Sequence, residues 1–140
     1  FGWFIRGLHH WGASAMVVVV LLHLISVFVM GSFRYPREVI WIIGCGLLLL
    51  TLAFGFTGYL LPWDQKAYWA TTVGTRIAGA IPVVGDFMRK LLLGGTEMGA
   101  ATLTRFYAFH MLAIPVGIVL LTGVHLFMVI RQGVSAPPEG

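Results

Sequence analysis

The chain has 140 residues, of which 59% are hydrophobic and only 10% are charged. A water-soluble domain of this size needs a polar coat, so this balance favours a lipid bilayer as the surrounding solvent. The formal net charge is +4, but the nine lysines and arginines are scattered and form no basic stripe, which argues against nucleic acid as a partner. Cys45 is the single cysteine, which excludes a disulfide within the chain, and there is no Cys-x-x-Cys-His motif for covalent haem attachment.

Three stretches are long and apolar enough to cross a bilayer, which takes roughly 20 residues of helix. They run from about Leu8 to Met30, from Val39 to Leu61 and from about Phe106 to Ile130. Backbone polar groups must find their hydrogen-bond partners within the segment in lipid. The sequence therefore predicts an all-α fold, a transmembrane helical bundle, over residues 1–140.

The connections between these stretches differ. Residues 31–38 form a short polar turn, whereas Pro62 ends the second stretch because its ring removes an N–H and clashes with the preceding turn. Residues 63–104 are of intermediate polarity and hold two runs that suit short helices with one apolar face, so we expect this segment to lie at the membrane surface. The final QGVSAPPEG is polar and is expected to leave the bilayer. Because the chain starts at Phe1 without a charged leader, we expect it to be a piece of a longer protein.

Four of the five histidines stand at matched intervals in the first and third stretches. His9 and His23 are 14 residues apart, and His110 and His125 are 15 apart. At about 100° and 1.5 Å per residue, each pair shares roughly one helix face and is separated by about 21 to 22 Å. Ionisable side chains are costly in lipid and usually mark a functional site, so these four residues are candidates.

Three spanning helices make the first and third parallel, so His9 faces His110 and His23 faces His125. Each level then offers two neutral imidazoles, the ligand set of six-coordinate haem iron in electron-transfer proteins. We therefore predict two b-type haems with these four histidines as iron ligands. Zinc is disfavoured because two histidines per level leave its tetrahedral shell unfilled. His10 has no matching partner and is expected to pack near the interface.

Two glycines and two arginines accompany the histidines. Gly44 and Gly58 repeat the 14-residue interval, and glycine lets a helix pass close to a flat haem; ordinary close packing of helices is the alternative. Arg6 precedes His9 by three residues, and Arg105 precedes His110 by five. Both arginines could meet haem propionates as charged donors, or extend instead to lipid phosphates.

Several motifs resemble the N-terminal, haem-bearing half of cytochrome b from the quinol-oxidising bc and b6f complexes. They are GWFIRGLHHWGAS, FGFTGYLLPWDQKAYWATTV, AIPVVG, and LTRFYAFHMLAIP followed by VHLFMVIRQGVS. The 15-residue histidine interval, and an ending soon after RQGVS, are similar to the cytochrome b6 type, in which the second half is a separate subunit. Mitochondrial-type members have 14 residues in both helices.

The resemblance implies that His9 and His110 hold the haem near the positive side of the membrane, and that His23 and His125 hold the haem near the negative side. It also implies a haem-binding four-helix bundle whose first helix is absent from this sequence. In b6-type proteins that segment carries a cysteine that attaches an additional haem, so the sequence leaves such a covalent haem open. Cys45 is in the wrong helix for that role.

The family's quinol-oxidation pocket corresponds to the end of the second predicted helix and the segment after it. The resemblance places Tyr59 and Trp69 in its lining, together with Pro62, Trp63 and the residues from Trp69 to Val73. The glutamate of the family's PEWY-type motif does not occur in this sequence, so removal of the quinol proton depends on a partner or on the other half of cytochrome b.

The function implied is a di-haem electron-transfer subunit of a proton-translocating quinol:acceptor oxidoreductase that works by a Q cycle. The implied partners are a Rieske iron–sulfur protein, a second cytochrome b half similar to subunit IV, a c-type cytochrome or other acceptor, and quinol and quinone. The resemblance also implies a dimeric complex in an energy-transducing membrane, either a bacterial inner membrane or a thylakoid.

Two other functions fit the histidines. One is a haem b anchor subunit for a dehydrogenase or hydrogenase, and the other is a proton or metal transporter with a histidine relay. The Trp-rich surface segment with its PWDQ motif favours the quinol-oxidising complex, since a plain anchor has no need of a cover over a quinone site.

Overall fold

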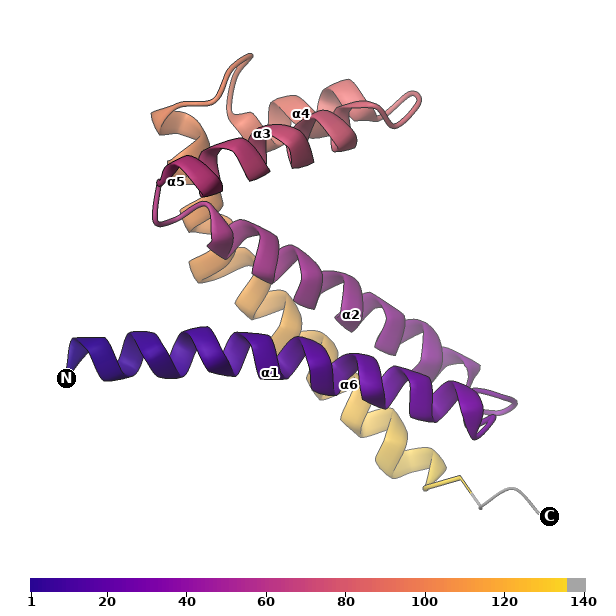
Figure 1. Ribbon diagram of the computed structural model, residues 1–140. Helices are drawn as coiled ribbons and strands as arrows, with labels where there is room; N and C mark the ends of the chain where they lie inside the picture. Colours follow the sequence, from indigo (N-terminus) through magenta and orange to yellow (C-terminus); the bar gives the residue numbers. More distant parts are fainter. Residues whose placement is uncertain (136–140) are drawn as a thin grey trace. The chain divides into compact units, whose positions relative to one another are not determined.

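The computed structural model describes residues 1–135 (Figure 1). These residues form helices joined by turns, without any strand: α1 (Gly2–Val29), α2 (Glu38–Tyr59), α3 (Gln65–Gly79), α4 (Gly85–Leu93), α5 (Ala100–Ala108), the π-helical segment η1 (Phe109–Ala113) and α6 (Ile114–Gln132). The end of the expected polar tail, residues 136–140, lies outside the described residues.

Three helices are long and apolar enough to cross a membrane, as predicted. They are Gly2–Val29, Glu38–Tyr59 and Ala100–Gln132, the last being α5, η1 and α6 in one continuous run. The first and third begin six residues before the predicted Leu8 and Phe106. At the third, the Thr102 hydroxyl accepts a hydrogen bond from the Gly99 N–H at 3.2 Å and donates to the Leu93 carbonyl at 2.7 Å, which secures the early start.

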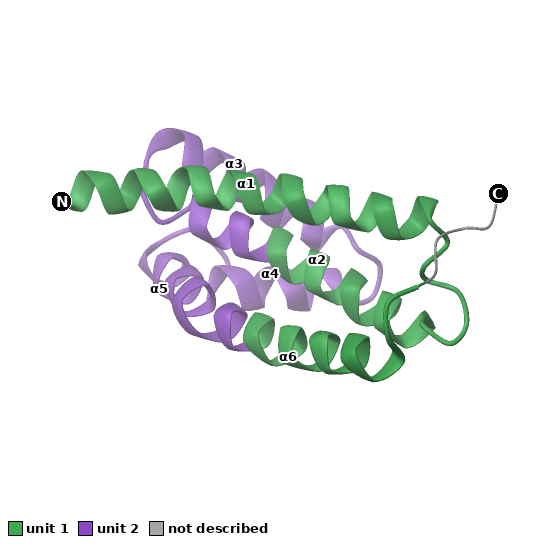
Figure 2. Cartoon of the chain, turned by 90° about the horizontal axis from the view of Figure 1, so that it is seen from below, with its two compact units in different colours: residues 1–52, 117–140 green, residues 53–116 purple. Residues whose placement is uncertain are grey.

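The described chain divides into two compact units, drawn in green and purple in Figure 2. The first unit consists of residues 1–52 and the residues from 117 onward, and the second consists of residues 53–116. Helices α2 and α6 each contribute to both units.

In the first unit, the short turn after α1 is tied down at two places. Phe28, Phe33 and Trp41 form an aromatic cluster, with ring centroids 5.5 Å apart for Phe28–Phe33 and for Phe33–Trp41. Ser32 and Ser135 are joined through their hydroxyl groups at 2.7 Å. The Arg37 guanidinium donates to the Gln132 and Gly133 carbonyls at 3.4 and 3.5 Å. These bonds link the turn to the C-terminal end of α6, where a cation also meets the negative end of the helix dipole.

In the second unit, α4 packs against both α3 and α5. The buried core consists of Leu60, Ala67 and Phe106, against which Phe56, Leu61, Leu92 and Met98 pack. Helix α3 begins at the Asp64 cap, whose side chain accepts the Ala67 N–H at 2.8 Å. The segment at residues 63–104 thus forms the two short helices expected of it; its place at the membrane surface stays a prediction.

Candidate functional site

His110 lies inside the π-helical segment η1 and is buried, with 8% of its surface exposed. The Ile114 N–H bonds to the Phe109 carbonyl, five residues back, in place of the usual four. Pro115 follows directly, and it lacks the N–H that would close an α turn onto Met111. Because Pro115 cannot donate this hydrogen bond, a wider turn at this place leaves no helical N–H without its partner. Such turns occur often at functional sites.

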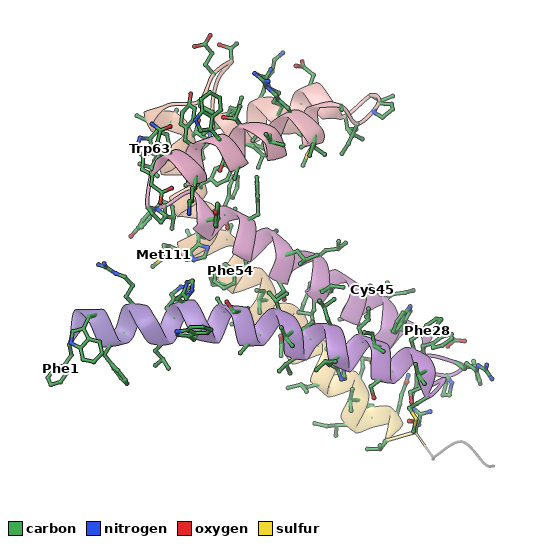
Figure 3. The ribbon with its side chains drawn as sticks, in the orientation of Figure 1. Phe1, Phe28, Cys45, Phe54, Trp63 and Met111 are labelled. Carbon is green, nitrogen blue, oxygen red and sulfur yellow. The ribbon has the colours of Figure 1, made fainter. Side chains whose placement is uncertain are left out.

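Two groups on α2 fix the His110 imidazole. Its Nδ1 lies 3.0 Å from the carbonyl oxygen of Phe54, the residue labelled in Figure 3, and 3.3 Å from Oγ1 of Thr57. A carbonyl can only accept, so Nδ1 carries the hydrogen, and in the neutral imidazole the lone pair then resides on Nε2. This is the tautomer that a metal-binding histidine needs, with the second nitrogen held by a neighbouring acceptor.

Gly58 brings the α2 backbone against the same ring. A Cβ atom added at Gly58 would lie 2.5 Å from Cε1 of His110, 3.0 Å from Nδ1 and 3.2 Å from Nε2. Real Cβ atoms almost never approach another atom closer than 3.0 Å, so only glycine fits this position without a shift of the ring. The Phe54 ring adds a second contact, with its centroid 4.4 Å from that of His110.

Gly44 and His125 form a second glycine–histidine contact, in the first unit. A Cβ atom added at Gly44 would lie 3.4 Å from Cε1 of His125, which is an ordinary van der Waals distance. The Nδ1 of His125 is buried and, among residues 1–135, makes no hydrogen bond of normal geometry, although the Ile40 backbone is close by. His23 lies on α1 in the same unit. The pairing of His23 with His125 stays a prediction.

His9 and Arg6 lie on α1 in the first unit, and both side chains are exposed. Arg105 lies on α5 in the second unit, where its Nη1 donates to the Leu91 carbonyl at 2.6 Å and its Nε approaches Gly94. The guanidinium thus binds the C-terminal end of α4.

The predicted quinol-pocket residues lie at the junction of α2 and α3 in the second unit. Tyr59 is the last residue of α2 and is exposed, and the exposed Trp69 donates its indole N–H to Oε1 of Gln65 at 3.1 Å. Tyr68 packs edge-to-face against both Trp63 and Trp69, with ring centroids 6.1 and 5.3 Å apart. The segment therefore presents a row of aromatic side chains.

Phe54 and Thr57 were not among the residues singled out from the sequence. The Phe54 contribution is a backbone carbonyl, which no side-chain pattern reveals. Thr57 could have been noticed as a hydroxyl in an apolar stretch directly before Gly58. Within the described part of the chain, no three His, Cys, Asp or Glu side chains gather as metal ligands, so donors there come at most in pairs.

Comparison with known proteins gives a consistent assignment. Residues 14–140 match the family described as cytochrome b (N-terminal)/b6/petB. Cytochrome b6 of Cyanidium caldarium is 50% identical over 137 residues, which are 98% of this chain and 64% of the relative. Cytochrome b6 of Prochlorococcus marinus strain AS9601 is 46% identical over 98% of this chain and 63% of its own length.

A solved structure, described as a hyperthermophilic respiratory Complex III, superimposes with a TM-score of 0.89 at 32% identity. The match covers 100% of this chain and 38% of that chain. The chain thus spans a little under two thirds of the curated relatives that it matches. With three apolar helices of spanning length and these relatives, it is an integral membrane protein, and it belongs to the cytochrome b N-terminal/b6 family.

Proposed function

We propose that this chain is the di-haem b electron-transfer subunit of a quinol-oxidising Rieske/cytochrome b complex of the bc or b6f type. The observation that carries the proposal is the repeated glycine–histidine contact, Gly58 with His110 and Gly44 with His125. The membership of the cytochrome b family supports it, as does the likeness to the respiratory complex.

The proposed iron ligands are His9 with His110 and His23 with His125. The residues fit haem b in their donor chemistry, because a neutral imidazole with its Nδ1–H already engaged offers Nε2 to iron. The buried Nδ1 of His125, which makes no well-formed hydrogen bond within residues 1–135, supports the second pair. When bound, each haem supplies a one-electron iron couple, while the helices hold the imidazoles in place and keep water away.

Glycine at positions 44 and 58 leaves room for the α2 backbone to lie close to the imidazoles. Arg6 remains a proposed propionate contact. For Arg105 that role would require the guanidinium to leave the Leu91 carbonyl or to use its remaining donors.

The same proposal places quinol near the aromatic row, with Tyr59 and Trp69 in the pocket lining. Electrons taken from quinol would be divided between a Rieske iron–sulfur protein and the two haem levels, in a Q cycle coupled to proton translocation. A second cytochrome b half, a c-type cytochrome or other acceptor, and a dimeric assembly in an energy-transducing membrane complete the proposed enzyme.

Redox difference spectroscopy of the purified complex tests this function. A b-type band in the reduced-minus-oxidised spectrum is expected, and His23→Leu should remove one haem while keeping much of the other. His110→Leu should remove the complementary one. His10→Leu is the matched control and should keep both. Absence of a b-type band, or full occupancy of both haems in His23→Leu, would contradict the proposal.

A further inference from the structure

Thr57 makes a buried polar contact with the ring of His110. The threonine is 4% exposed and the histidine 8% exposed, and Oγ1 lies 3.3 Å from Nδ1. The two residues are 53 positions apart in the chain, on α2 and η1. A hydroxyl placed this close to a candidate ligand in an apolar helix calls for an explanation beyond helix packing.

The direction of each hydrogen bond in this cluster follows from the donor inventory. The Thr57 hydroxyl has one hydrogen, which it donates to the Ala53 carbonyl at 2.9 Å or the Phe54 carbonyl at 3.1 Å. Its lone pairs therefore face Nδ1 of His110. Since Nδ1 already donates to the Phe54 carbonyl, its N–H is shared between a carbonyl and a hydroxyl, both accepting.

We propose that Thr57 is a positioning residue that lowers the reduction potential of the haem b held by His110; the inference rests on the haem ligation proposed above. An acceptor on Nδ1–H makes the imidazole a stronger electron donor through Nε2, which stabilises ferric over ferrous iron. The hydroxyl dipole also makes the surroundings of the more highly charged ferric state more polar. Both effects lower the reduction potential of the haem.

The effect should be confined to one of the two levels. Thr57 directly precedes Gly58, and the corresponding residue before Gly44 is Ile43, which has no hydroxyl. At that level the Nδ1 of His125 has no well-formed hydrogen bond within residues 1–135. A change at Thr57 should therefore move one potential and leave the other where it is.

Thr57→Val in the intact complex tests this, because valine keeps the branched shape and loses the hydroxyl. Redox titration of the b-type absorption should show one of the two waves moved to higher potential and the other unmoved. The ferric low-spin electron paramagnetic resonance signal of the same haem should change its g values, since the ring loses one of its restraints. Thr57→Ser should restore both the potential and the signal.

Thr51→Val is the matched control. Thr51 is also buried on α2, and its hydroxyl donates to the carbonyl four residues back, that of Leu47, at 2.8 Å. This variant should leave both waves at their wild-type potentials. If Thr57→Val assembles without the haem at His110, Thr57→Ser and Thr57→Ala are compared in its place. Only the alanine variant should then show a shifted reduction potential.

The inference is overturned if neither wave moves in the variants lacking the hydroxyl, if both waves move together, or if Thr51→Val gives the same shift. Failure of the proposed function has a different signature: a wild-type complex without b-type haem, or a His110→Leu variant that retains both haems.

Discussion

A Cβ atom on Gly58 would lie 2.5 Å from Cε1 of His110, whereas one on Gly44 would lie 3.4 Å from Cε1 of His125. The two glycine–histidine contacts thus differ by almost an ångström, although the glycines are 14 residues apart on one helix. The difference separates a position that excludes any side chain from one that tolerates a methyl group, and it leads to two graded predictions.

Gly58→Ala should displace the His110 ring and reduce or abolish the haem at that level, while the other haem remains. Forcing a methyl group into a filled space typically costs about 1–3 kcal/mol. Haem content and the redox difference spectrum measure the loss. Gly55→Ala, on the same helix, is the control, because a Cβ atom added at Gly55 would have open space around it. Full occupancy of both haems in Gly58→Ala would show that the ring has room to move.

Gly44→Ala should be nearly silent, since 3.4 Å is an ordinary contact distance, whereas Gly44→Leu should remove the haem held by His125. Gly46→Leu controls for the larger side chain, because the space around that glycine is open. Haem content and the redox difference spectrum again measure the outcome. A Gly44→Ala variant that loses as much haem as Gly58→Ala would contradict the difference in distances.

Asp64→Ala should loosen the first turn of α3, because the Ala67 N–H loses the carboxylate that accepts it at 2.8 Å. Loss of such a cap costs about 1 kcal/mol. Hydrogen exchange at the Ala67 amide should therefore become faster, and Asp64→Asn should largely preserve the slow rate. Unchanged exchange in the alanine variant would mean that water or packing replaces the cap.

Arg37→Gln should free the short turn from the end of α6 by removing the donors to the Gln132 and Gly133 carbonyls. A hydrogen bond usually contributes a net value of roughly 0.5–1.5 kcal/mol to the free energy of unfolding. Because these two bonds are long, we expect the loss of stability not to exceed this range. Hydrogen exchange across residues 31–37 reports the change. Arg34→Gln, in the same turn, should have no such effect; equal acceleration in both variants would point to a general effect of charge.

The spanning helices and the all-α fold could be predicted because lipid imposes a simple rule of length and apolarity on each segment. The start of the third helix at Ala100 could not, since it depends on Thr102 bonding to Gly99 and Leu93, and Leu93 lies outside the helix. Periodicity in the sequence brought His110 and Gly58 forward as separate candidates. Their contact is tertiary, and so is the placement of Thr57 beside the ring, which a single sequence does not encode in any local pattern.

The wide turn at residues 109–113 bears on the difference in angle that plain helix geometry gives the two histidine intervals. In plain α-helix, 14 residues end about 40° short of four full rotations and 15 residues end about 60° past them, a disagreement of about 100°. A π turn absorbs roughly one additional residue without advancing the helix. Because His110 lies within this turn, we expect the turn to bring the 15-residue interval in this helix closer to the phase of a 14-residue one. A helix of this kind can thus take up one more residue without a full 100° change in the direction of the side chains beyond it.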